Sequence, residues 1–171
     1  MPNQFSKILI IGLDNSGKTS IVLSLQKNIN LLSYTSLEPT KRFEITELDD
    51  LNSKFHIWDF GGQEQYRDDH LENLKTYLTG AKKFIYVIDI QDKKRFDLTL
   101  EYFKSIIKIL EEEKPSIKLS IFLHKFDPDL IIEADVVQKL IDQIIEILPE
   151  NFDYRIYKTS IYTIFRKIAL I

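Results

Sequence analysis

The sequence predicts one α/β domain, built on a mostly parallel sheet with helices on both faces. Two observations support this fold class. Apolar runs and helical patterns alternate from one end of the chain to the other, which is typical of βαβ units. The chain also has 171 residues, of which 44% are apolar and 29% charged, so it can bury one full hydrophobic core. We therefore expect a single domain over residues 1–171.

Six segments are expected to form strands, and four of them carry short apolar cores. Two of these runs, Ile8–Ile11 and Phe84–Ile88, are apolar without interruption, as in strands covered on both faces. A turn cluster at Asp49–Ser53 predicts an antiparallel hairpin at one edge of the sheet. The expected strands are Lys7–Ile11, Arg42–Leu48, Lys54–Trp58, Lys83–Ile90, Lys118–His124 and Tyr154–Lys158.

Helical periodicity is clearest in two later segments. Apolar residues recur three or four positions apart within Leu98–Leu110 and again within Val137–Leu148, which predicts one buried face on each helix. The basic run Lys93–Arg95, which precedes the first of these segments, is expected to be a solvated loop.

The composition excludes several kinds of site. The chain has no cysteine, which excludes disulfides, a thiol nucleophile and cysteine-based metal centres. Its net charge of −3 provides no basic field for a nucleic acid. Of the five glycines, Gly12, Gly17, Gly61 and Gly62 fall in two short clusters, so we expect the backbone to approach a ligand there.

The first glycine cluster has the pattern of a phosphate-binding loop. Residues 12–19 read GLDNSGKT, which fits G-x-x-x-x-G-K-[ST] directly after an expected strand. In such a loop, backbone N–H groups surround the α- and β-phosphates. Lys18 would reach the β/γ oxygens and the Thr19 hydroxyl would ligate Mg²⁺. The residues expected at the nucleotide are Asp14, Asn15, Ser16, Gly17, Lys18, Thr19 and Ser20.

The second glycine cluster follows the third expected strand, where residues 58–63 read WDFGGQ. Asp59 is placed like the carboxylate that holds Mg²⁺ through water. The N–H of Gly62 is placed for the γ-phosphate, and the side chain of Gln63 for orienting an attacking water. The two clusters together predict phosphoryl transfer from a nucleotide to water.

These motifs resemble those of Ras-superfamily small GTPases, which implies the P-loop NTPase (small G-protein) fold with a six-stranded sheet. Residues 59–63 resemble the D-x-G-G-Q motif of switch II. Pro39-Thr40 resembles switch I of the Arf branch, whose threonine ligates Mg²⁺ and binds the γ-phosphate. HKFD at 124–127 resembles the guanine motif in the H-K-x-D form of Rag/Gtr GTPases, and TSI at 159–161 resembles the last guanine motif in its Rag-like form.

Chemistry also favours guanine at this motif. Asp127 can accept hydrogen bonds from guanine N1–H and from its exocyclic amine, and adenine lacks this pair of donors. An unpaired buried carboxylate costs about 1–3 kcal/mol or more, so ATP should be rejected. The resemblance places the stem of Lys125 along the base, Ser160 on the carboxylate and the Ile161 N–H on guanine O6. His124 replaces the family's usual asparagine, which ties this loop to the P-loop.

The resemblance is divided between two branches. The P-loop, Pro39-Thr40 and the short interswitch look Arf-like, whereas the guanine motifs and Phe84–Glu113 look Rag-like. Rag proteins have a C-terminal dimerisation domain, and Arf proteins have an N-terminal amphipathic, usually myristoylated helix. Here the second residue is Pro2 and the stretch after Ser160 is short. We therefore expect no lipid anchor, and the chain to be one domain, whole or part of a longer product.

The sequence thus predicts a cytoplasmic GTP-binding switch that slowly hydrolyses GTP, with GTP/GDP and Mg²⁺ as cofactors. Mg²⁺·GTP would hold switch I around Thr40 and switch II around Gly62 in place, and hydrolysis would release them. Hydrolysis should be slow because Leu37 stands where a cis arginine would lie, three residues before Thr40. Gln63 is the expected catalytic residue, and the expected metal-binding residues are Thr19, Thr40 and Asp59.

Effector, exchange-factor and activating proteins are the expected partners at the switches, and dimerisation with another GTPase or a roadblock-type protein stays open. Two other classes also stay open. A nucleotide-bound scaffold without hydrolysis would not need Thr40 and Gln63. An ATP-using P-loop enzyme, such as a small-molecule kinase, would need lid arginines, but the arginines are scattered. Of the remaining histidines, His56 is expected to be structural, and His70 is a candidate partner contact.

Overall fold

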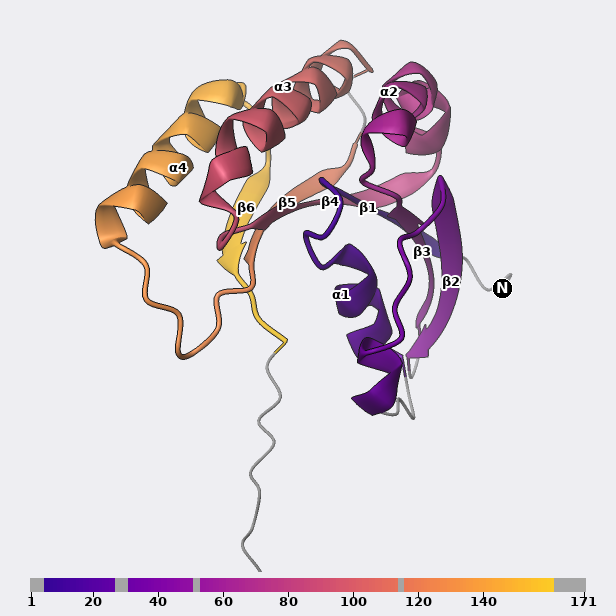
Figure 1. Ribbon diagram of the computed structural model, residues 1–171. Coiled ribbons are helices and arrows are strands. Elements are labelled where there is room, and N and C mark those ends of the chain that lie inside the picture. Colours follow the sequence, from indigo (N-terminus) through magenta and orange to yellow (C-terminus); the bar gives the residue numbers. More distant parts are fainter. Residues whose placement is uncertain (1–4, 27–30, 51–52, 114–115, 162–171) are drawn as a thin grey trace, which may run out of the picture.

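A six-stranded sheet forms the centre of the molecule, in the order β2-β3-β1-β4-β5-β6 (Figure 1). The computed structural model describes residues 5–26, 31–50, 53–113 and 116–161. The strands are β1 Ser6–Ile11, β2 Phe43–Asp50, β3 Ser53–Phe60, β4 Ala81–Asp89, β5 Lys118–His124 and β6 Tyr154–Lys158. The helices are α1 Lys18–Ser24, α2 Glu64–Leu78, α3 Phe96–Glu113 and α4 Ala134–Ile147, with 3₁₀ helices η1 Leu31–Tyr34 and η2 Lys93–Arg95.

The predicted fold class is confirmed. β2 pairs with β3 in antiparallel orientation at one edge, and the other neighbouring strands are parallel. β3 runs two residues beyond its expected end, because Asp59 and Phe60 still pair with Glu44 and Phe43 of β2. The metal-site candidate Asp59 is therefore held within a strand and not in the loop after it.

Two hydrophobic layers hold the helices on the sheet. Helices α2, α3 and α4 cover one face, while α1 lies on the opposite face (Figure 1). Because side chains alternate along a strand, Leu9 and Ile11 of β1 pack in the larger cluster, which includes residues of α2, α3 and α4. Ile10 points the other way and packs with Ile21 and Val22 of α1. This alternation explains why β1 is apolar without interruption.

His56 and His70, the two histidines outside the motifs, both pack against aromatic rings. His56 stacks on Phe5 with ring centroids 3.9 Å apart, which agrees with the structural role expected of it. His70 of α2 is fully buried and meets the ring of Phe60 edge-on at 5.0 Å. A partner contact through His70, which the sequence left as a possibility, does not fit this arrangement, because α2 packs with that side chain inward.

No helix within the described residues is long and apolar enough to cross a membrane. The expectations that rest on Pro2, and on the short stretch after Ser160, concern residues 1–4 and 162–171. These residues lie outside the described ranges.

Candidate functional site

A cavity of about 250 Å³ opens at the carboxyl end of β1. Open α/β sheets bind their ligands at this edge, beyond the carboxyl ends of the strands. Both glycine clusters contribute to the wall, as does the Pro39-Thr40 pair. The lining residues are Asp14, Asn15, Gly17, Lys18, Thr19, Ser20, Leu37, Glu38, Pro39, Thr40, Gly61, Gly62 and Gln63.

The P-loop follows β1 and ends where α1 begins at Lys18. Asn15 and Gly17 both have positive φ, at 57° and 91°, so the loop curls its backbone as an anion-binding loop does. A methyl group on Gly17 would lie 2.5 Å from Cδ2 of His124, so the position also needs glycine for space. Ser16 is buried under this loop, outside the cavity wall, and its Oγ has no hydrogen-bond partner among the described residues.

Lys18 places a buried amine at the cavity. Its side chain is almost fully covered, and Nζ donates to the main-chain carbonyl of Leu13 at 2.7 Å. Burial lowers the pKa of Lys18 to about 8, although the charges of Asp59 and Asp14 oppose the shift. An anionic ligand would stabilise the ammonium form here.

Three oxygen-bearing side chains from distant segments meet beside Lys18. The Thr19 hydroxyl donates to Asp59 Oδ2 at 2.6 Å and lies 3.0 Å from the Thr40 hydroxyl. Asp59 Oδ1 is buried and has no hydrogen-bond partner within the described ranges. Burial raises the pKa of Asp59, while the Thr19 hydrogen bond and the Lys18 charge oppose this shift. An all-oxygen set with an unsatisfied carboxylate oxygen has the chemistry that Mg²⁺ prefers.

The second glycine cluster touches both other loops through its backbone. A methyl group on Gly61 would lie 2.2 Å from the carbonyl oxygen of Thr40, and one on Gly62 would lie 2.1 Å from the nitrogen of Asp14. The Gly61 N–H donates to the carbonyl of Arg42 at 2.7 Å. These contacts require the absence of a side chain, which explains why the scarce glycines gather here.

Gln63 stands between Gly62 and the start of α2. It is the residue before the helix, with an extended backbone (φ −64°, ψ 146°), and it lines the cavity. Its Oε1 accepts a 3.4 Å hydrogen bond from Nε2 of Gln65. The residue expected to orient water therefore lies on the cavity wall beside Gly62.

The base-recognition candidates gather where β5 and β6 end, because parallel neighbours bring their carboxyl ends to one edge. Lys125 has a left-handed backbone (φ 61°), and its Nζ donates to the carbonyl of Asn15 and to Asp89 Oδ2, each at 2.7 Å. The Ser160 hydroxyl donates to Asp127 Oδ1. Ile161 follows directly and is half-buried. These residues flank the phosphate cavity and are not part of its wall.

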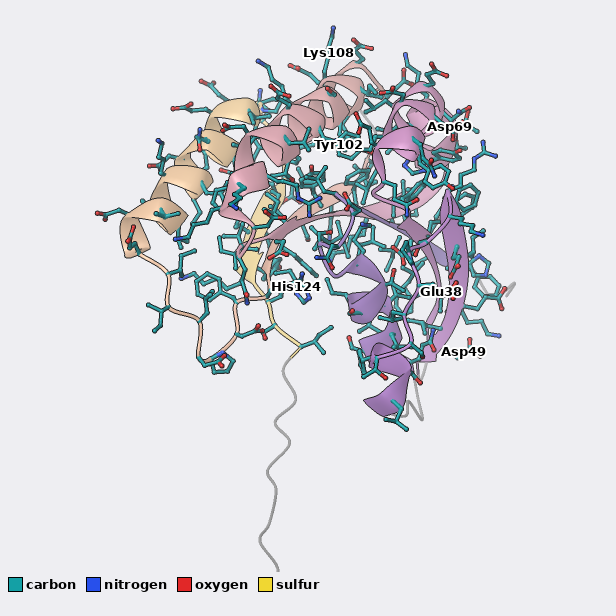
Figure 2. All side chains as sticks on the ribbon, in the orientation of Figure 1. Glu38, Asp49, Asp69, Tyr102, Lys108 and His124 are labelled. Atoms are coloured by element: carbon teal, nitrogen blue, oxygen red, sulfur yellow. The ribbon has the colours of Figure 1, made fainter. Side chains whose placement is uncertain are left out.

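His124 joins the same loops in the interior, between β5 and α1 (Figure 2). Its Nδ1 shares a 2.9 Å hydrogen bond with the Thr159 hydroxyl, while the ring edge packs on Gly17. The link expected between this loop and the P-loop is thus a packing contact, and the hydrogen bond goes to Thr159, the residue directly after β6. Burial lowers the pKa of His124, and the charge of Lys125 adds to the shift.

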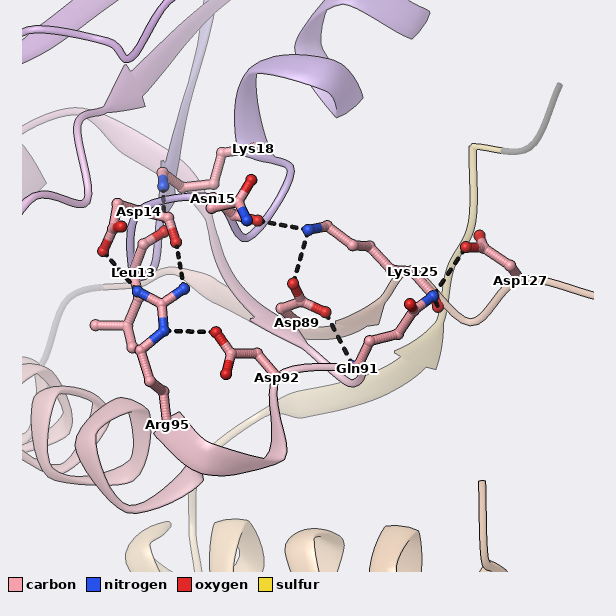
Figure 3. A network of polar contacts seen from close by, with 10 residues as sticks. All are labelled: Leu13, Asp14, Asn15, Lys18, Asp89, Gln91, Asp92, Arg95, Lys125 and Asp127. Atoms are coloured by element: carbon pink, nitrogen blue, oxygen red, sulfur yellow. Dashed lines mark hydrogen bonds and ion pairs between the residues drawn. The ribbon is translucent and has the colours of Figure 1, made fainter. Parts of the chain in front are cut away.

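Arg95 corrects one expectation directly. The Lys93–Arg95 segment forms η2, in which Lys93 and Lys94 are exposed as expected, whereas Arg95 turns inward to the P-loop (Figure 3). Nη1 lies 2.8 Å from Asp14 Oδ1, and Nε pairs with Asp92 Oδ2. No motif marks this contact. Asp89 at the end of β4 is a second residue of this region that was not predicted. Its sequence position did carry a signal, because it is a polar residue that ends a buried strand at the same edge of the sheet as Asp59.

Comparisons with known proteins agree with the Arf-like part of the resemblance. A sequence model of one family, described as "Arf: ADP-ribosylation factor family", matches residues 1–164. ADP-ribosylation factor 1 of Brassica rapa subsp. pekinensis is 34% identical over 139 residues, which covers 81% of this chain and 71% of that relative. ADP-ribosylation factor 3 of Arabidopsis thaliana is 33% identical with the same coverage. ADP-ribosylation factor-like protein 3 of Chlamydomonas reinhardtii is 33% identical, covering 80% and 72%.

Among solved structures, the chain is similar to the Arl6 BBS3 small GTPase from Trypanosoma brucei with bound nucleotide analogue GppNp. The TM-score is 0.71 at 19% sequence identity, and the match covers 92% of this chain and 87% of that chain. At this identity the likeness concerns the fold, and it agrees with the sheet order and helix layers described above.

Proposed function

Since the chain belongs to the ADP-ribosylation factor family of Ras-superfamily small GTPases, which are GTP-hydrolysing molecular switches, we propose a specific arrangement for its switch. The chain binds guanine nucleotide in the cavity and at the base loop beside it. Mg²⁺ binds with the nucleotide, and the loops around Thr40 and Gly62 respond to the γ-phosphate.

The meeting of Thr19, Thr40 and Asp59 is the single observation that carries this proposal. Their oxygens lie within 3.4 Å of one another, although they come from α1, the segment before β2, and β3. The two hydroxyls would ligate Mg²⁺ directly and Asp59 would hold it through water. When bound, the metal neutralises charge on the β- and γ-phosphates.

The remaining cavity residues have separate roles in GTP hydrolysis. Lys18 binds phosphate oxygens, and the Gly62 N–H holds the γ-phosphate. Gln63 orients a water whose oxygen bonds to the γ-phosphorus while the bond to the β–γ bridging oxygen breaks, giving GDP and phosphate. Leu37, three residues before Thr40, lines the cavity but has no charge to stabilise the transition state. The intrinsic rate is therefore slow, and an activating protein would supply the missing cation.

The switch loops act together because they are bonded to each other. The Gly61 N–H donates to Arg42, whose Nε lies 3.1 Å from Asp69 Oδ2 on α2. Loss of the γ-phosphate would release Thr40 and Gly62, and the two switch loops joined by these contacts would then both become less ordered. Effectors, exchange factors and activating proteins would bind at this paired surface.

The test is the nucleotide itself. Nucleotide extracted from the purified chain should be GDP or GTP by mass spectrometry, and adenine nucleotide would overturn the proposal in favour of an ATP-using enzyme. Chain loaded with GTP should then release phosphate slowly in a single turnover. Retention of intact GTP over many hours would indicate a nucleotide-bound scaffold instead.

A further inference from the structure

The loop after β4 contains none of the recognised motifs, yet its Gln91 reaches the base-recognition loop. Nε2 of Gln91 donates to the carbonyl oxygen of Lys125 at 2.8 Å and to Asp127 Oδ2 at 2.9 Å (Figure 3). An amide nitrogen has two hydrogens, and this geometry uses both. Gln91 therefore contacts Lys125 and Asp127, two of the residues expected at the base.

Gln91 is itself held in place by Asp89. The Gln91 main-chain N–H donates to Asp89 Oδ1 at 2.9 Å, and the other oxygen of Asp89 accepts the Lys125 Nζ at 2.7 Å. The Asp89 side chain is about nine-tenths buried, so its direction is fixed by packing. One carboxylate thus orients both the lysine of the base motif and the glutamine that supports it.

These contacts fix the plane of the Asp127 carboxylate. The terminal torsion of an aspartate has a broad energy minimum, so its plane is set by hydrogen-bond partners. Ser160 donates to Oδ1 and Gln91 donates to Oδ2, one donor on each side. Each oxygen keeps a free lone pair, so both can still accept from a ligand. Gln91 also stabilises Lys125, whose left-handed backbone is unfavourable for a residue with a side chain.

We propose that Gln91 is a positioning residue for guanine selectivity, acting through Asp127. The inference rests on the proposed function, in which Asp127 accepts from N1–H and the exocyclic amine of guanine. A carboxylate held in the base plane can meet both donors, whereas a rotated one meets a single donor. Gln91 therefore affects most the contact that separates guanine from hypoxanthine, which lacks the exocyclic amine.

The test compares GDP with inosine diphosphate on the full chain. Gln91→Met keeps the length of the side chain and removes the amide. It should weaken GDP binding about tenfold but inosine diphosphate only about threefold, so the preference for GDP falls about threefold. Gln91→Glu places a second carboxylate beside Asp127 and should reduce GDP binding further. Gln138→Met is the matched control, because Gln138 donates to Asp142 at 2.8 Å on the exposed side of α4.

A double mutant shows whether Gln91 acts through Asp127. In an Asp127→Ala background, Gln91→Met should change GDP affinity less than twofold. Equal losses for GDP and inosine diphosphate, unchanged GDP affinity, or full additivity with Asp127→Ala would each overturn the proposal. If the parent chain binds no GDP, or Asp127→Ala binds it as tightly as the parent, the guanine assignment fails instead.

Discussion

The guanidinium of Arg95 hydrogen-bonds to both the side chain and the main chain of Asp14, a P-loop residue that lies 81 positions earlier in the sequence. Nη1 lies 2.8 Å from the carboxylate Oδ1 and Nη2 lies 3.1 Å from the main-chain carbonyl. Because one rigid fork binds side chain and backbone together, it fixes the direction of the peptide as well as the charge. Arg95 thus stabilises the conformation of the phosphate-binding loop, although it is not one of the residues that line the cavity.

Arg95→Ala should speed the release of GDP about three- to tenfold. The estimate is modest because both side chains are partly exposed, which screens the ion pair. Dissociation of a fluorescent GDP analogue gives the rate. Lys94→Ala, which changes the exposed neighbour in η2, should leave release unchanged. Equal release from the Arg95 variant and the parent would show that the P-loop holds its shape alone.

Gln63→Leu should slow single-turnover GTP hydrolysis at least tenfold while GTP affinity stays within about twofold, because the amide orients water and holds no phosphate. Phosphate release from preloaded chain measures the rate. Gln138→Leu, on the exposed side of α4, is the matched control and should hydrolyse like the parent. If both variants match the parent, Gln63 has no part in the reaction.

Thr19→Asn should weaken GTP binding more than GDP binding when Mg²⁺ is present. The Thr19 hydroxyl would ligate Mg²⁺, which would neutralise charge on the γ-phosphate, and GDP lacks the γ-phosphate. Competition binding with and without a chelator measures the effect. Relative to the parent, the ratio of GTP affinity to GDP affinity should fall about tenfold with Mg²⁺ and change little once Mg²⁺ is removed. A ratio unaffected in both conditions would exclude Thr19 as a metal ligand.

Asp127→Asn should move base preference from guanine toward xanthine. Guanine presents two donors to the carboxylate, while xanthine presents one donor and one acceptor, which match an amide. Charge-assisted bonds contribute about 1.5–3 kcal/mol each, so GDP affinity should fall at least about tenfold. Competition between GDP and xanthosine diphosphate on parent and variant measures the shift. Asp129→Asn, two residues on and exposed, is the control.

His124→Asn should make stability less dependent on pH below about 6.5. Burial lowers the pKa of His124 in the folded chain, so the unfolded chain takes up a proton first as pH falls. The free energy of unfolding therefore decreases with acidification because of this residue. His70, whose pKa burial also lowers, adds a loss of the same sign and is retained in the variant.

Urea denaturation at pH 7.5 and 5.5, without added nucleotide, gives the two free energies of unfolding. The difference between them should be smaller in the variant than in the parent. An identical difference would mean that protonation of His124 does not contribute.

Sequence patterns were sufficient for the sheet and for the motif loops. Each of the six strands was predicted near its observed position, and parallel pairing then brought the loops after β1, β3, β5 and β6 to one edge. Contacts made by single side chains across the fold were not predictable. Gln91 and Asp127 are 36 positions apart and Arg95 and Asp14 are 81 apart, and no local periodicity records such pairs. The inward turn of Arg95 was not predicted for this reason, whereas Lys93 and Lys94 are exposed as expected of a basic run.

Asp59 Oδ1 is a buried polar atom with no hydrogen-bond partner among the described residues, and Lys18 is buried beside Asp59 with a lowered pKa. Polar groups buried in this way cost free energy unless a ligand or its ion satisfies them. Bound nucleotide and its ion would satisfy Asp59 and Lys18, and the nucleotide would then contribute to the stability of the folded chain. The free energy of unfolding then depends on the concentration of free nucleotide. It increases by about 2.7 kcal/mol when that concentration is one hundred times the dissociation constant. A cell depleted of guanine nucleotide would hold less of the folded chain as well as less of its active form.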